Sequence, residues 1–215
     1  MKTLIAKPAL ASHALLAAVF LSGCVSFKQA QTVAISHGPL PNAQTQDLGA
    51  ISVRRFSDGR KSEDKPYVGE MRGHAYTPTG RFFVIKDGGN LSELLTASFS
   101  DALKAAGYRV SALPDEGTTP QPADAVLEGE IKKFWLTPAW NTRQEISIQL
   151  RLRTKDGKDL LWEKEVEGQH GKFVGYPNAP EYEEVIQKAL DKTLAQAVKE
   201  FSSDEFQGKV KAINQ

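Results

Sequence analysis

The sequence predicts an α+β protein in which two helices pack on one face of a mostly antiparallel sheet. Apolar and polar residues alternate in three consecutive segments between residues 125 and 167, as expected for strands with one buried face. Two other segments, 90–106 and 180–201, repeat apolar residues at helical spacing. The order strand, irregular hairpin, helix, strand, three-strand meander and helix fits a sheet covered by helices on one side.

The composition indicates one domain with appendages. The chain has 215 residues, which suits a single compact unit, and we expect that unit to span 48–204. The single cysteine excludes an intrachain disulfide framework and a zinc cluster built only of cysteines. The formal net charge is +1, and loss of Lys2 and Lys7 with a leader would leave 25 basic against 26 acidic residues, a net charge of −1. The charge therefore gives no indication of nucleic acid as a partner.

Residues 1–23 are interpreted as a secretory signal peptide. Lys2 and Lys7 give a basic start without acidic residues, and 9–21 is mostly small or apolar. A stretch of about 13 such residues is shorter than the roughly 20 needed to span a bilayer as a helix. A basic start, a short apolar middle and small residues at the end are typical of a secretory signal.

The end of this leader, Leu21-Ser22-Gly23-Cys24, resembles the lipobox of bacterial lipoproteins at all four positions. The resemblance implies that diacylglycerol is joined to the Cys24 thiol, that the leader is cut before Cys24, and that the freed amine is acylated. One acyl chain holds a protein only reversibly, whereas two or three chains make attachment effectively permanent. Val25 stands where an aspartate would favour retention in the inner membrane, so we expect the periplasmic face of the outer membrane.

Residues 24–47 are expected to form the lipidated N-terminus and a flexible tether. The segment is rich in Gln, Ser, Thr and Asn, contains Pro39 and Pro41, and shows no strong period. As a coil, about 23 residues would span roughly 25 Å, and well over ~60 Å when extended. The alternative is that 32–36 forms a strand that joins the sheet.

In the first half of the domain, the sequence pattern predicts three strands and one capped helix. Asn90 is an N-cap residue with Glu93 three positions later, as in a capping box, and Gly107 follows the helix at the position that favours a left-handed residue. The expected strands are 49–55, 81–86 and 108–111, and the expected helix is 90–106.

The second half predicts a three-strand meander, 125–136, 145–153 and 159–167. In the first of these strands Lys133 is the exception to an otherwise apolar face. That predicted face is formed by Ala125, Leu127, Gly129, Ile131 and Trp135.

The turn between the last two strands follows from parity, because residues opposite one another share a face. A two-residue loop at 156–157 would mix the two faces. A three-residue loop at 155–157 pairs Leu152 with Leu160 and predicts a positive φ at Gly157.

The closing helix, 180–201, has a continuous apolar stripe and a mixed polar face. We expect residues 205–215 to be a frayed tail. The apolar positions of the helix are Tyr182, Val185, Ile186, Ala189, Leu190, Leu194, Ala197, Val198 and Phe201.

Over roughly residues 47–204 the chain resembles the YajG-type envelope lipoproteins and, more loosely, the auxiliary lipoproteins of ABC transport systems. The resemblance implies a periplasmic domain at the outer membrane without established catalysis. It is carried by the lipobox, the polar tether, Val53-x-x-Phe56-x-Asp58-x-Arg60, the helix ending in Gly107-Tyr108-x-Val110, the meander and the closing helix.

No catalytic or metal constellation is visible in the sequence, and we expect no cofactor. No two of the histidines downstream of the leader lie within one helical turn. The segment 87–90 (DGGN) is interpreted as a turn and helix cap rather than an anion site, and Asp58 and Arg60 as a salt bridge that closes a turn. The histidines are His37, His74 and His170.

Four aromatic residues stand out: Trp135, Trp140, Phe173 and Tyr176. Of these, Trp140, Phe173 and Tyr176, which lie in predicted loops, are the candidate binding residues. Aromatic side chains on loops can stack on sugars or contact a partner protein; packing in the core or under a lid is the alternative.

The sequence thus favours a lipid-anchored, non-enzymatic module that binds an envelope protein or another envelope component. The alternative is a lipoprotein that binds a small glycan or lipid in envelope transport or maintenance. A hydrolase of envelope polymers would need paired acids, or an acid and a histidine, in a deep pocket.

Overall fold

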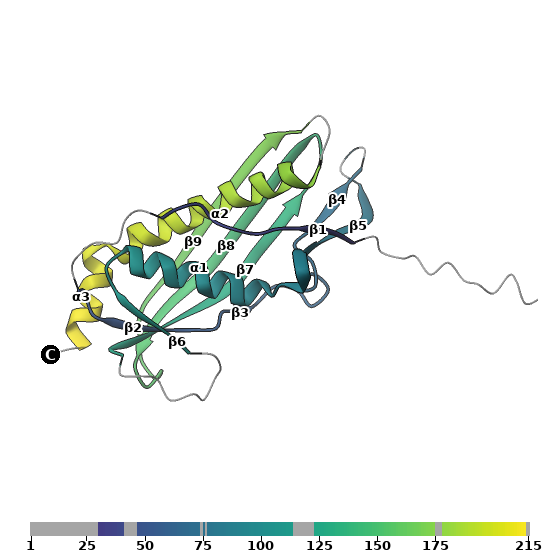
Figure 1. Cartoon of the computed structure of the whole chain (residues 1–215). Coiled ribbons are helices and arrows are strands. Elements are labelled where there is room, and N and C mark those ends of the chain that lie inside the picture. Colours follow the sequence, from purple (N-terminus) through teal and green to yellow (C-terminus); the bar gives the residue numbers. More distant parts are fainter. Residues whose placement is uncertain are drawn as a thin grey trace, which may run out of the picture.

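The computed structural model describes residues 30–40, 47–73, 75, 77–113, 123–174 and 178–213. These residues form a nine-stranded sheet with the long helices on one face (Figure 1). In chain order the elements are β1 (Ala30–Val33), β2 (Ala50–Arg54), β3 (Ser57–Asp58), β4 (Gly69–Arg72), β5 (Pro78–Ile85), the short 3₁₀ helix η2 (Lys86–Gly88), α1 (Leu91–Ala105), β6 (Arg109–Leu113), β7 (Ala125–Thr137), β8 (Asn141–Thr154), β9 (Leu160–Phe173), α2 (Ala179–Phe201) and α3 (Asp204–Ile213).

Strand β7 organises the sheet. On one side it pairs with β8, which pairs with β9, and both pairings are antiparallel. On its other side β2, β3 and β4 pair with successive parts of β7, all in parallel. Beyond these strands, β6 extends β2 in parallel, and β5 and β1 extend β4.

The α+β class is confirmed, but the expectation of a mostly antiparallel sheet is wrong, because the sheet is mixed. The three-strand meander is antiparallel, since short loops join its strands. The parallel pairs arise where a long connection intervenes: β2 and β6 are separated in sequence by three strands and α1, and such crossovers allow parallel pairing.

The predicted ends of α1 are confirmed. The Asn90 side chain accepts hydrogen bonds from the backbone N–H groups of Ser92 (2.9 Å) and Glu93 (3.3 Å), and Gly107 has φ 98°. The Glu93 carboxylate does not complete a capping box; it forms an ion pair with Arg55 at 2.8 Å.

Helix α2 packs on the inner face of β8 and β9 beside α1 (Figure 1). All but Val198 of its predicted apolar positions are buried. The approach to β9 is closest at Gly168, where an added Cβ would overlap the Thr193 hydroxyl and the Ala189 carbonyl oxygen. Glycine is needed at this position because a helix and a strand come into backbone contact there.

The described part of the expected tether, 30–40, belongs to the fold. Ala30–Val33 is strand β1, so the alternative of a strand in this region is correct, slightly upstream of the expected position. The chain then runs along α2 (Figure 1), where the backbone N–H of Ala34 donates to Glu183 (2.8 Å) and that of Gly38 to Asp191 (2.6 Å). The expectation of a flexible tether is wrong for these residues.

The expected frayed tail is a third helix, α3, up to Ile213. Its fully buried Phe206 packs edge-to-face on Trp162, with ring centroids 4.9 Å apart, and on Tyr108 at 5.6 Å. Val210, one turn later, is also buried. Helical structure therefore continues past Ser203, because Phe206 and Val210, four residues apart, lie on one face of α3 and pack into the core.

The β8–β9 turn has the predicted positive φ at Gly157 (75°), but its register differs from the prediction. The backbone N–H of Thr154 donates to the Asp159 carbonyl, so the loop has four residues. A bulge follows, and Leu152 pairs with Trp162 rather than with Leu160. The apolar residues still share a face because the displacement from the predicted register is two residues.

The predicted apolar face of β7 is correct up to Ile131 and wrong at Trp135. A bulge between Ile131 and Lys133 shifts the register against β8. Beyond it Phe134 and Leu136 are fully buried, and Trp135 lies on the opposite face. The exception noticed at Lys133 marks the point at which the alternation inverts.

Candidate functional site

The tip of the β-meander carries an exposed aromatic pair. Trp140 lies in the β7–β8 loop and Phe173 at the end of β9, with ring centroids 6.2 Å apart. The backbone N–H of Val174 donates to the Trp140 carbonyl (3.1 Å) and joins the two segments. The side chains are 74% and 67% exposed, so the alternative of core or lid packing does not apply. The third candidate, Tyr176, lies outside the described residues.

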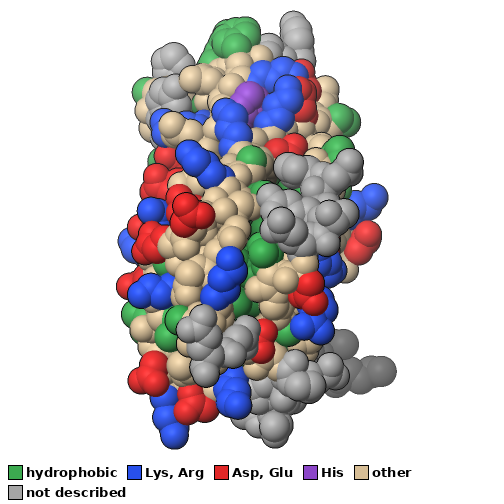
Figure 2. All heavy atoms as spheres, turned by 90° about the vertical axis from the view of Figure 1, so that its left-hand side faces the viewer, with side chains coloured by type: hydrophobic (Ala, Val, Ile, Leu, Met, Phe, Trp, Pro, Cys, Tyr) green, Lys and Arg blue, Asp and Glu red, His purple; other side chains and the backbone are tan. Residues whose placement is uncertain are grey.

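Basic side chains gather beside this tip, where Figure 2 shows lysine and arginine side chains around a histidine. Lys172 and Lys188 both pair with Glu184, each at 2.6 Å, and their hydrogen bonds lower the pKa of that carboxyl to about 2. The ammonium of Lys192 donates to the Gln169 carbonyl (3.0 Å).

His170 lies within this group of lysines. Burial and the nearby charges of Lys192 and Lys188 lower the pKa of its imidazole, which favours the neutral form at pH 7. Lys172 and Lys188 thus share the Glu184 carboxylate, whereas Lys192 donates to a backbone carbonyl, so the basic side chains in this group outnumber the acid with which they pair. We call Trp140, Phe173 and these three lysines the tip surface.

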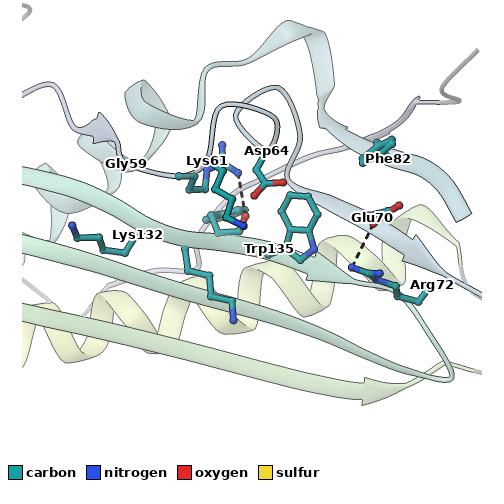
Figure 3. A pocket seen from close by; sticks show the side chains of 11 residues that line it. Gly59, Lys61, Asp64, Glu70, Arg72, Phe82, Lys132 and Trp135 are labelled. Carbon is teal, nitrogen blue, oxygen red and sulfur yellow. Dashed lines mark hydrogen bonds and ion pairs between the residues drawn. The ribbon is translucent and has the colours of Figure 1, made fainter. Parts of the chain in front are cut away.

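A separate pocket of about 450 Å³ opens where three segments meet: the loop after β3, the β4–β5 hairpin and the outer side of β7. Figure 3 shows the Trp135 ring between the loop that carries Asp64 and the strand that carries Glu70 and Arg72. We call this cavity the Trp135 pocket. Its lining residues are Gly59, Arg60, Lys61, Asp64, Glu70, Arg72, Phe82, Lys132, Lys133, Phe134 and Trp135.

Arg60 holds the loop that forms one wall of this pocket. Its side chain is 4% exposed and pairs side-on with Asp58, through Nε–Oδ1 (3.0 Å) and Nη2–Oδ2 (2.8 Å). The remaining N–H groups donate to the carbonyls of Tyr67 (2.7 Å), Lys65 (3.1 Å) and Phe134 (3.2 Å). All five guanidinium donors are therefore used, and the predicted local salt bridge is confirmed.

The β7 bulge supplies the opposite wall. It exposes Lys132 and Lys133 and turns Trp135 outward, toward the β4–β5 hairpin. On that hairpin Phe82 stacks on Tyr67, with centroids 4.2 Å apart and an interplanar angle of 27°. Two aromatic rings, from different strands, thus border the cavity.

The charges of this pocket are mixed. Glu70 pairs with Arg72 at 3.4 Å, and Lys132 and Lys133 pair with acids outside the lining, Glu130 and Glu145.

The break in the apolar alternation at Lys133 was the only sequence signal for this pocket, but Trp135 was predicted to lie on the buried face of the strand. No sequence pattern indicated that the residues of the loop after β3 and of the β4–β5 hairpin would line the same pocket.

The segment 87–90 lines a second cavity, of about 510 Å³, and acts as the predicted turn and cap. Asp87 (φ 58°) and Gly88 (φ 68°) are left-handed, and the Asn90 side chain caps α1. The loop geometry therefore serves the entry into the helix.

Within the described residues, no three His, Cys, Asp or Glu side chains gather as metal ligands would, and no helix there is long and apolar enough to cross a membrane. His37 hydrogen-bonds the Gly38 carbonyl through Nδ1 at 2.9 Å. His74 and the lipobox residues Leu21, Ser22, Gly23 and Cys24 lie outside the described part of the chain.

Solved structures share this fold. A Xanthomonas campestris protein of the family DUF330 superposes with a TM-score of 0.57 at 11% sequence identity, over 86% of this chain and 99% of the other. A Helicobacter pylori protein described as a homologue of a neuraminyllactose-binding haemagglutinin superposes with a TM-score of 0.50 at 13% identity, over 82% of this chain and 98% of the other. No family model matches the sequence, and no curated protein sequence matches it. At these identities the similarity is one of fold.

Proposed function

We propose that this chain is a lipoprotein anchored through Cys24 at the periplasmic face of a bacterial outer membrane, where it binds another envelope component without catalysing a reaction. The observation that carries the binding role is the exposed pair Trp140 and Phe173 beside a positive surface. Binding is also the activity in the description of the Helicobacter pylori fold neighbour.

The aromatic pair has the properties of an interface centre. Large aromatic side chains are enriched among residues whose truncation costs about 2 kcal/mol or more of binding energy. Trp140 and Phe173 project from adjoining strand ends that the Val174–Trp140 hydrogen bond ties together. The pair can therefore enter a partner's pocket with little loss of backbone entropy.

The lysines indicate the charge of the partner. Lys172, Lys188 and Lys192 belong to the tip surface; the first two pair with Glu184, and Lys192 donates to the Gln169 carbonyl. Electrostatic complementarity favours a partner with an acidic rim around an apolar pocket, and an association rate that falls as salt rises. An acidic envelope protein fits this description best.

The anchor places the fold close to the membrane. Only five residues, 25–29, lie between Cys24 and Ala30, the first residue of β1. A fully extended chain of that length reaches about 20 Å, far less than the expected flexible tether would allow. An anchor at Cys24 would therefore hold the domain close to the membrane, with the edge formed by β1 and β5 nearest to the anchor.

Site-specific photo-crosslinking in intact cells tests the role of the tip surface. A photoreactive residue at position 140 or 173 should give a discrete adduct, and the same residue at position 160 should not. Leu160 is a matched control, because it is also a large exposed hydrophobic residue (49%) and lies at the other end of β9.

The adduct should weaken when Lys188 and Lys192 are both replaced by Gln, and when Cys24→Ser releases the chain from the membrane. Equal adducts from positions 140, 173 and 160, or none from any of them, would contradict the proposed binding surface.

A further inference from the structure

We infer that the Trp135 pocket is a binding site for a saccharide, with the pyranose ring against the Trp135 and Phe82 side chains. The site lies apart from the tip surface and shares no residue with it. Its volume, about 450 Å³, falls within the range of roughly 300–1,000 Å³ typical of small-molecule sites.

The aromatic walls suit the apolar face of a sugar ring. An indole presents a flat surface on which the C–H groups of a pyranose can pack while its hydroxyls remain at the rim. The β7 bulge directs Trp135 outward, and bulges commonly re-aim a side chain beside a functional site. Phe82 is fixed by its stack on Tyr67.

The polar rim contains both donors and acceptors. Asp64 and Glu70 can accept hydrogen bonds, and Lys61 and Arg72 can donate them. Within the described part of the chain, the side chains of Lys61 and Asp64 form no hydrogen bond or ion pair, so both can serve a ligand. Each sugar hydroxyl both donates and accepts, and a rim of mixed character satisfies it.

The carboxylates in the lining favour a polyol over a simple anion. Five basic residues line the pocket together with two acids, Asp64 and Glu70. Three more acids, Asp58, Glu130 and Glu145, pair from outside the lining with Arg60, Lys132 and Lys133. Glu130 and Glu145 also pair with Arg151 and Arg143, but a phosphate in the cavity would still face the two lining carboxylates, Asp64 and Glu70.

The wall that carries Lys61 and Asp64 is preorganised. Arg60 fixes this loop to β7, because its guanidinium donates to the loop carbonyls of Lys65 and Tyr67 and to the Phe134 carbonyl of β7. A preorganised site loses less entropy on binding.

A glycan array tests this inference. The purified chain from Cys24 onward, labelled at its only cysteine, should bind a chemically related group of immobilised saccharides. Titration of the best free saccharide should saturate and change the tryptophan fluorescence. Inorganic phosphate, titrated in parallel, should give no such change.

Two pocket variants and one control assign the signal. Trp135→Ala and Asp64→Ala should each weaken saccharide binding about tenfold or more, a loss of ~1.4 kcal/mol. Leu160→Ala, a truncation of an exposed hydrophobic side chain at the start of β9, should bind as the wild type does. Asp64 lies in a partly exposed turn, so its variant tests the site even where Trp135→Ala disturbs folding.

The inference is overturned when no saccharide on the array binds above background, when both pocket variants bind like the wild type, or when phosphate alone saturates the site. Because the crosslinking test uses the tip surface and this test the pocket, failure of one leaves the other standing.

Discussion

Replacing Arg60 by alanine removes the residue that holds the wall of the Trp135 pocket. The side chain is buried and donates to the Asp58 carboxylate and to the carbonyls of Lys65, Tyr67 and Phe134. Arg60→Ala leaves a carboxylate and three carbonyl groups without these donors. The expected effect is therefore larger than that of an ordinary surface substitution.

The magnitude follows from the burial of the pair. Removing one partner of a buried ion pair typically costs about 3–5 kcal/mol. The Arg60 side chain is 4% exposed but that of Asp58 is 17% exposed, so water can partly replace the lost donors. We expect a loss near the lower end, about 3 kcal/mol, which corresponds to a fall of roughly 1.5 M in the urea midpoint at a slope of ~2 kcal/mol/M.

The loss should depend on pH. Burial alone would raise the pKa of Asp58, but the hydrogen bonds and charge of Arg60 outweigh burial and hold that pKa below its usual value. The ionised pair thus stabilises the fold fully above the pKa of an unfolded aspartate, about 4. Its contribution is lost as the pH falls through the lower folded-state pKa. Arg60→Ala removes the side-chain hydrogen bonds and the charge of Arg60 but keeps burial, the backbone N–H of residue 60 and Lys65, so the difference from wild type should shrink on acidification.

Urea unfolding at pH 7 and pH 4, followed by tryptophan fluorescence, measures both effects. Arg109→Ala is the control, because its ion pair with Asp47 is largely exposed and such pairs contribute about 0–1 kcal/mol. A loss below ~1 kcal/mol for Arg60→Ala at pH 7 would contradict the reasoning, as would a loss that grows at pH 4.

Three further predictions concern packing and charge. Gly168→Ala should destabilise the fold by at least ~1–3 kcal/mol, because the added Cβ would overlap α2. Gly208→Ala lies in an uncrowded stretch of α3 and should stabilise the fold by about 0.5–1 kcal/mol. Thermal unfolding of the two variants tests this difference. Phe206→Ala should cost about 3–5 kcal/mol in urea unfolding, and a neutral result would mean that α3 is not part of the core. Lys192→Gln should raise the pKa of His170 in an NMR titration, since the Lys192 charge helps to lower it; an unchanged value would remove that lysine from the group around the histidine.

The helices and the meander could be predicted because their signals are local. The Asn90 cap, the left-handed Gly107 and the apolar stripe of α2 depend on neighbouring residues. Local periodicity also predicted the strands of the meander, including the positive φ at Gly157.

Pairing between distant segments could not be predicted in this way. The parallel alignment of β2, β3 and β4 along β7 depends on contacts far apart in sequence. The segments β1 and α3 could not be predicted for a related reason: they are short, and they gain their stability from the core against which they pack. Val33 and Phe206 are fully buried although their segments read as a tether and a tail.

The two candidate sites show the same division. Trp140 and Phe173 were identified because aromatic residues in predicted loops are conspicuous, and the structure brings them together. The Trp135 pocket was missed because a single-residue bulge inverts the alternation of β7. The Asp58–Arg60 pair was anticipated as a local turn, but the contacts of Arg60 with Tyr67 and Phe134 were not.

The mass of the N-terminal peptide of the protein isolated from its native membrane tests the central claim most directly. We expect a peptide that begins at Cys24 and carries diacylglycerol on the thiol with an acylated amine, and a Cys24→Ser chain that leaves the membrane fraction. A peptide with a free Cys24 thiol, from a protein recovered in the soluble fraction, would contradict it.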